Sequence, residues 1–131
     1  MKLLIDTRVW LWMGLESRRI GRKTRALLED PANELAVSVV SAWEIIVKAA
    51  RGKLELPMEA SEYIRTRFRR SGASVLSVQL NHVLALPSLK AIHSDPFDRM
   101  LLAQALTDGL TFVTADDRLL SYPVVILDAR K

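Results

Sequence analysis

Short apolar runs alternate along this chain with segments of helical spacing, and this alternation restricts the possible folds more than any other feature. The apolar runs lie at 2–5, 35–39, 75–78, 110–114 and 124–127, and helices are predicted between them. A continuous apolar run is typical of a strand that is covered on both faces. We therefore predict an α/β fold, a three-layer α/β/α sandwich with a mainly parallel central sheet of about five strands.

The composition is that of one packed domain. The chain has 131 residues, of which 50% are hydrophobic and 26% charged, so we expect a single domain over residues 1–131 and no disordered tail. It contains no cysteine, which excludes disulfide scaffolds, zinc–cysteine sites and thiol nucleophiles. The absence of cysteine is compatible with a reducing compartment, and no apolar run is long enough to cross a bilayer. We expect a cytoplasmic protein without a membrane partner.

Single residues mark where several helices begin and end. Ser41 is the predicted cap of a helix that runs to about Arg51, because a serine hydroxyl can accept a hydrogen bond from the first turn. Asp95 is the predicted cap of the clearest helix, since Pro96 suits the first helical position, where no N–H is needed. Gly109 is expected to end that helix.

Four acidic residues stand next to the ends of the predicted strands. Asp6 follows the first strand, Glu44 lies in the helix after the second, Asp98 begins the helix before the fourth, and Asp116 follows the fourth. Ligands of such sheets gather beyond the carboxyl ends of the strands. Crowded carboxylates repel one another, and a divalent cation would offset that repulsion. We therefore predict that these four acids bind Mg²⁺ or Mn²⁺, which prefer oxygen ligands and can activate water.

Each acid also has an explanation that needs no metal. Asp6 and Asp116 could each cap a following helix. Glu44 could form an ion pair with Lys48 four residues later, which is a favourable helical spacing. We assign Asp95 mainly to capping. The metal hypothesis therefore depends on the joint position of the four acids and not on any one of them.

Further residues are secondary candidates for the site. Asp117 follows the fourth acid and could add a ligand, and Thr114 could form a hydrogen bond to a carboxylate or to a metal-bound water. Ser41 could do the same, although capping is the favoured role. His82 and His93 are the only histidines, and we expect both to be structural. Metal-free cleavage of RNA by paired histidines is therefore not favoured.

The formal charge of +4 favours polyanionic partners without identifying one. Basic residues form two clusters, one of Arg18, Arg19, Arg22, Lys23 and Arg25, and the other of Arg65, Arg67, Arg69 and Arg70. Each cluster could attract RNA phosphates or could be an ordinary solvated helix surface. Sequence-specific recognition of a nucleic acid cannot be read from the chain.

Several stretches of the sequence resemble the motifs of one known family. They are LLIDT at 3–7 with LW at 11–12, SAWEI at 41–45 with Lys48, GKL at 52–54, HSDPFDRMLLAQA at 93–105 and FVTADD at 112–117. Together these motifs resemble those of the PIN-domain nucleases, and in particular the VapC toxins of VapBC toxin–antitoxin pairs. The resemblance covers nearly the whole chain.

The resemblance implies a function as well as a fold. It implies cleavage of RNA that depends on Mg²⁺ or Mn²⁺, with Asp6, Glu44, Asp98 and Asp116 at the acidic positions. It also implies a VapB-type antitoxin that blocks the acidic cleft, and a homodimer. The expected function is that of a metal-dependent endoribonuclease toxin of a type II toxin–antitoxin system.

Arg8 departs from the family pattern, because many relatives have histidine directly after the Asp-Thr pair. Arginine stays charged at neutral pH and cannot act as a titrating base. Arg8 could hold an RNA phosphate, neutralise an acid or form a surface ion pair. It supports the alternative that the chain is a noncatalytic PIN-like module that binds RNA or a protein partner. An aspartyl phosphotransferase fits less well, because no second aspartate lies two residues after Asp6.

Overall fold

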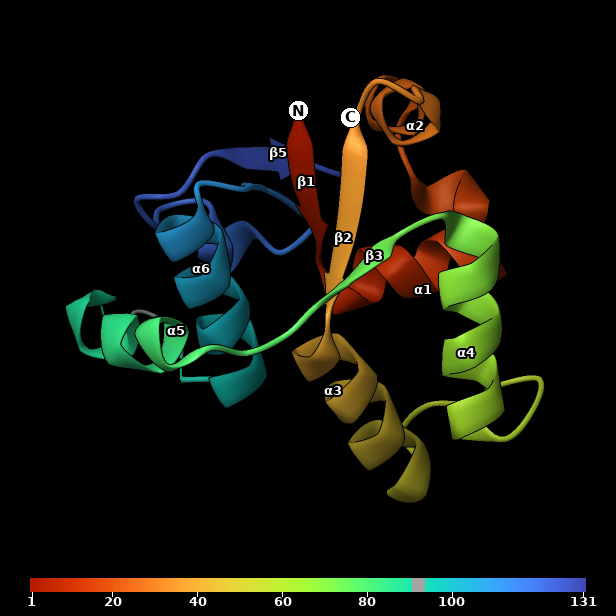
Figure 1. Ribbon diagram of the computed structural model, residues 1–131. Coiled ribbons are helices and arrows are strands. Elements are labelled where there is room, and N and C mark those ends of the chain that lie inside the picture. The colour runs from red at the N-terminus through yellow and green to blue at the C-terminus, as the bar shows by residue number, and fades with distance from the viewer. Residues whose placement is uncertain (91–93) are drawn as a thin grey trace.

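Five strands form one fully parallel sheet in the order β3–β2–β1–β4–β5 (Figure 1). The computed structural model describes residues 1–90 and 94–131. The strands are β1 (Lys2–Ile5), β2 (Glu34–Ser38), β3 (Ser74–Leu76), β4 (Thr111–Thr114) and β5 (Ile126–Asp128). The central strand β1 pairs with β2 on one side and with β4 on the other. The predicted parallel sheet is confirmed.

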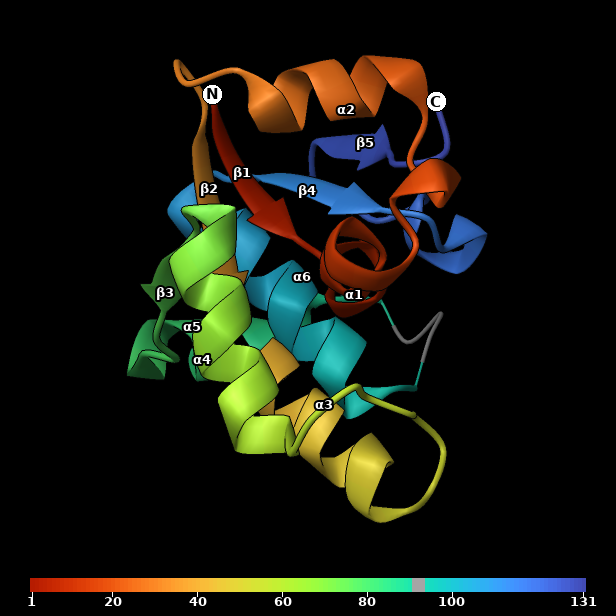
Figure 2. The ribbon, with the colours of Figure 1, turned by 90° about the vertical axis from the view of Figure 1, so that its right-hand side faces the viewer.

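Helices cover both faces of the sheet, as the three-layer prediction requires (Figures 1 and 2). They are α1 (Thr7–Leu15), α2 (Arg22–Glu29), α3 (Val39–Ala50), α4 (Ala60–Ser71), α5 (Leu80–Ala85) and α6 (Pro96–Asp108). Helices α1, α2 and α4 lie on one side of the sheet, α5 and α6 lie on the other, and α3 extends from the carboxyl end of β2. No helix in the described ranges is long and apolar enough to cross a membrane.

The two faces of β1 belong to two different hydrophobic cores. Leu3 and Ile5 pack with Trp10 on the side of α1 and α4, whereas Leu4 packs with Leu101 on the side of α6. Successive side chains of a strand point to opposite faces, so burial of both faces requires apolar residues at every position. This explains why the first strand reads as a continuous apolar run.

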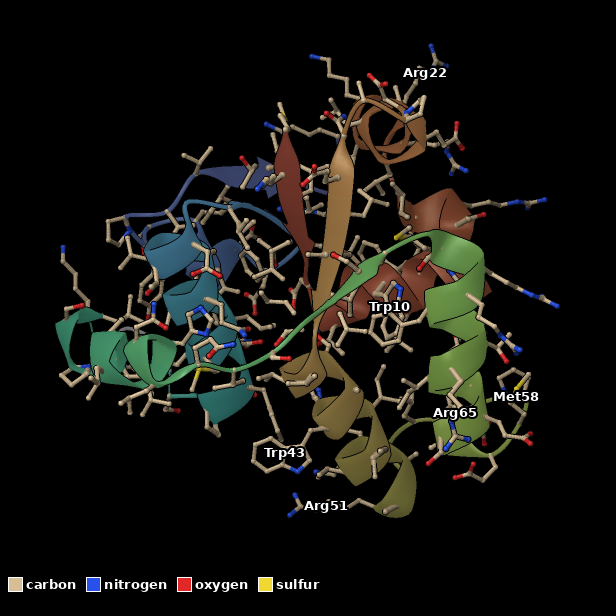
Figure 3. The ribbon with its side chains drawn as sticks, in the orientation of Figure 1. Trp10, Arg22, Trp43, Arg51, Met58 and Arg65 are labelled. Carbon is tan, nitrogen blue, oxygen red and sulfur yellow. The ribbon has the colours of Figure 1, made fainter. Side chains whose placement is uncertain are left out.

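Trp10 of α1 and Trp43 of α3 have opposite environments (Figure 3). Trp10 is buried, and its ring lies 4.7 Å from that of Phe68 on α4. Trp43 is 60% exposed and touches Phe97 edge-on at a ring distance of 4.8 Å. Trp10 therefore anchors α1 to α4, whereas Trp43 joins α3 to α6 at the surface.

The predicted cap of α3 is wrong. Ser38, the last residue of β2, caps the helix, because its side chain accepts a hydrogen bond of 3.0 Å from the backbone N–H of Val40. Ser41 lies inside the first turn, is buried, and its hydroxyl accepts a hydrogen bond of 2.7 Å from the Thr7 hydroxyl. The β-branched residues Val39 and Val40 favour a strand, and this preference extends the predicted strand into the helix.

Other element ends agree better with the predictions. Asp95 caps α6 and accepts hydrogen bonds from the N–H groups of Phe97 and Asp98, at 2.8 and 3.1 Å. Gly109 ends the same helix with a φ of 65°, a left-handed conformation that suits glycine. The fifth strand begins at Ile126, two residues later than predicted.

Candidate active site

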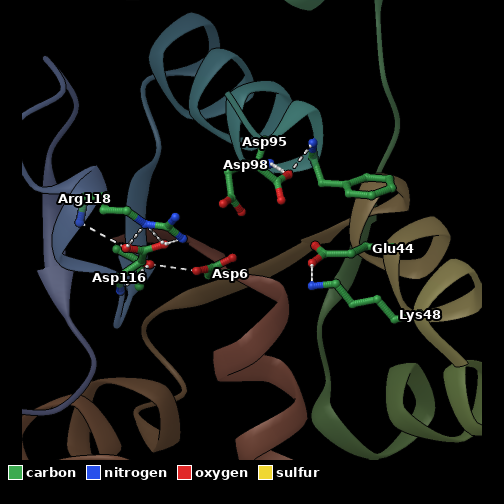
Figure 4. Close-up of polar contacts among 9 residues, drawn as sticks. Asp6, Glu44, Lys48, Asp95, Asp98, Asp116 and Arg118 are labelled. Carbon is green, nitrogen blue, oxygen red and sulfur yellow. Dashed lines mark hydrogen bonds and ion pairs between the residues drawn. The ribbon is translucent and has the colours of Figure 1, made fainter. Parts of the chain in front are cut away.

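A cavity of about 440 Å³ lies where α1, α3, α6 and the loop after β4 approach one another. Its lining includes all four acids of the predicted site, Asp6, Glu44, Asp98 and Asp116, together with Asp95. Figure 4 shows the side chains of Asp6, Glu44 and Asp98 turned toward the same space. Residues from four separate stretches of the sequence are thus brought together at the carboxyl edge of the sheet.

Asp6 is buried at the end of β1, with 6% of its surface exposed. Burial, together with the nearby charges of Asp98 and Glu44, raises its pKa to about 7. Two hydrogen bonds oppose this shift, one of 2.6 Å donated by the Thr114 hydroxyl and one of 2.8 Å donated by the backbone N–H of Thr7. Asp6 is therefore held firmly in a place that disfavours its charge.

Glu44 lies in the second turn of α3 and is 5% exposed. Its Oε2 atom accepts a hydrogen bond from Lys48, so the predicted ion pair is confirmed. Within the described part of the chain, no hydrogen-bond donor reaches its buried Oε1 atom. A buried carboxylate oxygen without a donor is costly, and a cation or a water molecule would satisfy it.

Asp98 stands in the first turn of α6, where the N-terminal end of a helix favours a negative charge. Asp95 holds the backbone N–H of Asp98 through the cap hydrogen bond, and both residues line the cavity. The same cap therefore begins α6 and sets the position of Asp98.

Asp116 caps the short 3₁₀ helix Asp117–Leu119, as one of the two explanations for it predicts. Both of its carboxylate oxygens accept hydrogen bonds from Arg118, the shortest being 2.7 Å between Oδ2 and Nη2. Its backbone N–H donates to the Thr114 hydroxyl at 3.2 Å. Thr114 therefore bridges Asp6 and Asp116 from a fully buried position, which suits its predicted supporting role.

The structure separates the other candidates. Arg8 is exposed and lines the cavity. Asp117 is not among the lining residues, and its carboxylate binds Arg130, with Nη2 at 2.5 Å from Oδ1. His82 is buried, with Nε2 3.0 Å from Asp108, and neither of these residues lines the cavity. His93 lies outside the described residues.

Basic side chains also line the cavity, and the sequence predicts a link to the acids only for Arg8 and Lys48. They are Arg8, Arg19, Lys48, Lys53 and Arg118. Lys48 and Arg118 bind Glu44 and Asp116 directly, so part of the acidic charge is balanced within the chain. The Asp-x-Arg spacing at 116–118 is the one local signal for the second of these pairs.

The donor set fits a divalent cation in its chemistry. Carboxylate oxygens are the ligands that Mg²⁺ and Mn²⁺ prefer. Burial and the neighbouring acids raise the pKa of Asp6, and a bound cation would favour its charged form. Among the residues that the structure describes, no three acidic, histidine or cysteine side chains form a complete metal-binding group. Mg²⁺ usually keeps several waters and binds few carboxylates directly, so an incomplete protein cage is compatible with it.

Comparisons with known proteins agree with the fold and with the motifs. A family model described as PIN domain matches residues 3–125. Ribonuclease VapC22 of Mycobacterium tuberculosis (strain ATCC 25618 / H37Rv) is 29% identical over 127 residues, which cover 92% of this chain and 91% of that protein. Ribonuclease VapC16 of the same strain is 42% identical over 60 residues, and this match spans 46% of the chain and only 43% of VapC16.

Solved structures with the same fold come from toxin–antitoxin complexes. DNA-bound VapBC from Salmonella typhimurium aligns with a TM-score of 0.72 at 17% identity and covers 97% of each chain. VapBC2 from Rickettsia felis, bound to a DNA fragment from its promoter, aligns with a TM-score of 0.71 at 12% identity, covering 97% of this chain and 98% of the other. At these identities the likeness shows the fold alone. Because the family model spans most of its residues, the chain belongs to the PIN-domain family.

Proposed function

We propose that this chain is an endoribonuclease that depends on Mg²⁺ or Mn²⁺ and acts as the toxin of a type II toxin–antitoxin system. The proposal rests mainly on one observation: Asp6, Glu44, Asp98 and Asp116 line a single cavity although they come from distant parts of the sequence. Relatives named ribonuclease VapC support the choice of RNA as substrate.

The residues of the chain have distinct roles in this proposal. A bound divalent cation supplies a water of lowered pKa and offsets the charge that develops on the phosphate. Asp6, Asp98 and Asp116 would provide oxygen ligands for this cation, and Glu44 would add the Oε1 atom that no described donor reaches. Thr114 keeps the Asp6 carboxylate in place, and Arg8 at the cavity edge binds a phosphate of the RNA.

Cleavage of RNA by the purified protein tests this proposal. We expect single-stranded RNA to be cut with Mg²⁺ or Mn²⁺, to stay intact with EDTA, and to yield products with a 5′-phosphate. Asp6→Asn and Asp98→Asn should each lower the rate by about 100-fold or more, since each removes a charge that acts in the transition state. Asp117→Asn is the matched control, because Asp117 binds Arg130 and does not line the cavity.

Two outcomes would overturn the proposal. Cleavage that persists in EDTA and in both active-site variants would exclude a metal-dependent carboxylate site. RNA binding that survives substitution of all four acids, without any metal-dependent cleavage, would favour a noncatalytic PIN-like module that binds RNA or a protein partner.

We further propose a VapB-type antitoxin as the partner of this chain in the cytoplasm. Support comes from the solved complexes that share the fold, which are described as VapBC assemblies. Co-expression with the product of an adjacent short reading frame should give a stable complex and suppress cleavage. Separate migration of the two proteins in gel filtration would count against this partner.

We also propose a homodimer. Leu80, Val83 and Leu84 are exposed together on the short helix α5, and apolar groups that gather on a surface often mark an interface. Light scattering of the purified protein should give twice the mass of one chain, and a monomer at all concentrations would exclude the dimer.

A further inference from the structure

Two arginines of this chain form the same local ion pair with an aspartate two residues earlier. In both pairs the backbone N–H of the arginine donates a hydrogen bond of 3.0 Å to Oδ1 of the aspartate. Nε also donates to Oδ1, at 3.0 Å for Arg118 and 2.8 Å for Arg130, and Nη2 donates to Oδ2, at 2.7 and 2.8 Å. The aspartates are Asp116 and Asp128. The same local geometry therefore forms at two separate Asp-x-Arg turns of the chain.

The surroundings of the two pairs differ. Arg130 also binds Asp117 and holds the last turn of the chain, and it does not line the acidic cavity. Arg118 lines the cavity with a side chain that is 61% exposed (Figure 4). The hydrogen bond to Asp116 raises the pKa of Arg118, and the charges of Asp98 and Asp95 add to this effect. Arg118 therefore sits as a cation among acids of the site.

The position of Arg118 conflicts with the role proposed for Asp116. Both Asp116 oxygens accept hydrogen bonds from the guanidinium, so both oxygens are already occupied by a positively charged group. A guanidinium and a divalent cation also repel each other at short range. Binding of a metal at Asp116 and binding of Arg118 at Asp116 therefore compete.

We propose that Arg118 changes partners during the reaction. Its guanidinium dissociates from the Asp116 carboxylate and binds a phosphate group of the RNA. This inference rests on the proposed function. A guanidinium binds a phosphate through two parallel hydrogen bonds as well as it binds a carboxylate, so the exchange keeps the arginine satisfied. It also removes the guanidinium from both Asp116 oxygens, so that a divalent cation no longer competes with Arg118 there. Arg118 is thus a substrate-binding residue that shields the acidic site while no RNA is bound.

The exchange predicts two effects of opposite sign for Arg118→Gln. The variant should bind Mn²⁺ about threefold to tenfold more tightly, because the competing cation is gone. It should bind a fluorescein-labelled oligoribonucleotide about threefold to tenfold more weakly in Ca²⁺. The slope of its RNA affinity against salt concentration should fall by the amount that about one phosphate contact contributes. Calorimetry or the Mn²⁺-induced rise in melting temperature measures the first effect, and fluorescence anisotropy measures the second.

Arg130→Gln is the matched control, because it breaks the same local pair outside the cavity. It should change neither Mn²⁺ nor RNA affinity. Arg118→Lys, which keeps the charge without the planar fork, should retain Mn²⁺ affinity near that of the unmodified protein and lose part of the RNA affinity. Melting curves in EDTA establish that each variant is folded. If Arg118→Gln does not fold, Arg118→Lys tests the RNA contact, and RNA affinity equal to that of the unmodified protein overturns the inference.

The inference is overturned if either effect is missing. Unchanged Mn²⁺ affinity would mean that Arg118 does not compete for Asp116, and unchanged RNA affinity would mean that it does not reach the substrate. Failure of the proposed function looks different, because the unmodified protein would then bind no Mn²⁺ and cleave no RNA. An active unmodified protein whose Arg118→Gln variant behaves like Arg130→Gln would overturn this inference alone.

Discussion

Asp6 illustrates at the scale of one residue how position and charge conflict in this site. Its carboxylate is buried beside Asp98 and Glu44, which raises its pKa to about 7, while Thr114 and the backbone N–H of Thr7 hold it in place. The hydrogen bonds orient Asp6 without removing the conflict. In the absence of a cation, the ionised carboxylate therefore lowers the stability of the folded chain.

The metal-free protein should become less stable as pH rises, because of Asp6. Its pKa is raised from 3.8 to about 7 on folding, so the folded chain binds more protons than the unfolded chain between these values. The free energy of unfolding should therefore fall by a few kcal/mol as pH rises through this window. Urea unfolding in EDTA at a series of pH values measures the slope.

Asp6→Asn provides the control for this pH dependence. An asparagine keeps an acceptor for Thr7 N–H and carries no charge, so the slope should become shallower and the variant should be more stable than the unmodified protein at pH 8. Mn²⁺ should stabilise the unmodified protein at pH 8 more than it stabilises the variant. A variant that is less stable at pH 8 with an unchanged slope would contradict this account.

The sequence predicts the four acids, because each lies next to a strand end or near the start of a helix. It also predicts a supporting role for Thr114, yet it cannot show that Thr114 binds Asp6, since the two residues are 108 positions apart. The ion pair of Arg118 with Asp116 is not predicted from helical spacing. The two residues are two positions apart in a turn, whereas side chains that pair on a helix are three or four positions apart. Contacts made in turns or across the fold are therefore the part that the sequence leaves open.

At the scale of secondary structure, the alternation of strands and helices is fully predicted, whereas the exact ends are not. The Asp95-Pro96 start of α6 is correct because two independent signals agree there. The predicted start of α3 is wrong. Val39 and Val40 favour a strand by propensity, but the Ser38 cap and the packing of Val40 in the core favour a helix. Tertiary packing decides such cases.

Capping by Asp95 should be separable from its charge. Asp95→Ala removes both hydrogen bonds to the first turn of α6 and should lower the free energy of unfolding by about 1 kcal/mol. Asp95→Asn keeps an acceptor and should cost much less, because asparagine caps helices as well as aspartate does. Urea unfolding of both variants gives the comparison. Equal losses in the two variants would show that the charge of Asp95, and not its cap, stabilises the helix.

At the scale of the whole molecule, the order of the strands is the feature that the sequence does not specify. Alternating strands and helices with right-handed crossovers are compatible with several orders of a parallel sheet. The observed order places β1 between β2 and β4, and this position brings Asp6 beside both Glu44 and Asp116. Packing of the complete chain, and not any local pattern, sets that arrangement.

The close approach of Gly21 to the last residues links α2 to the end of the chain. Its N–H donates to the Ala129 carbonyl at 2.8 Å, and a Cβ atom at Gly21 would lie 2.2 Å from the carbonyl carbon of Lys131 and 2.5 Å from that of Arg130. Gly21→Ala should therefore lower the free energy of unfolding by about 1–3 kcal/mol, because two backbone segments must separate. Chemical denaturation measures this loss.

Gly14→Ala is the comparison for this prediction. A Cβ atom at Gly14 would meet Arg67 Nε at 2.7 Å and the Tyr63 hydroxyl at 2.9 Å, which are ends of side chains that can move. The loss should be smaller than for Gly21→Ala, since alanine also favours the helix at this position. A larger loss at Gly14 than at Gly21 would contradict the view that backbone contact sets the cost.

The central place of the first strand has a consequence for the synthesis of the protein. Asp6 and Glu44 are synthesised long before Asp98 and Asp116. A nascent chain that stops between Glu44 and Asp98 therefore carries two of the four carboxylates and lacks β4, the strand that pairs with β1. Under the proposed function, such a fragment would have no nuclease activity.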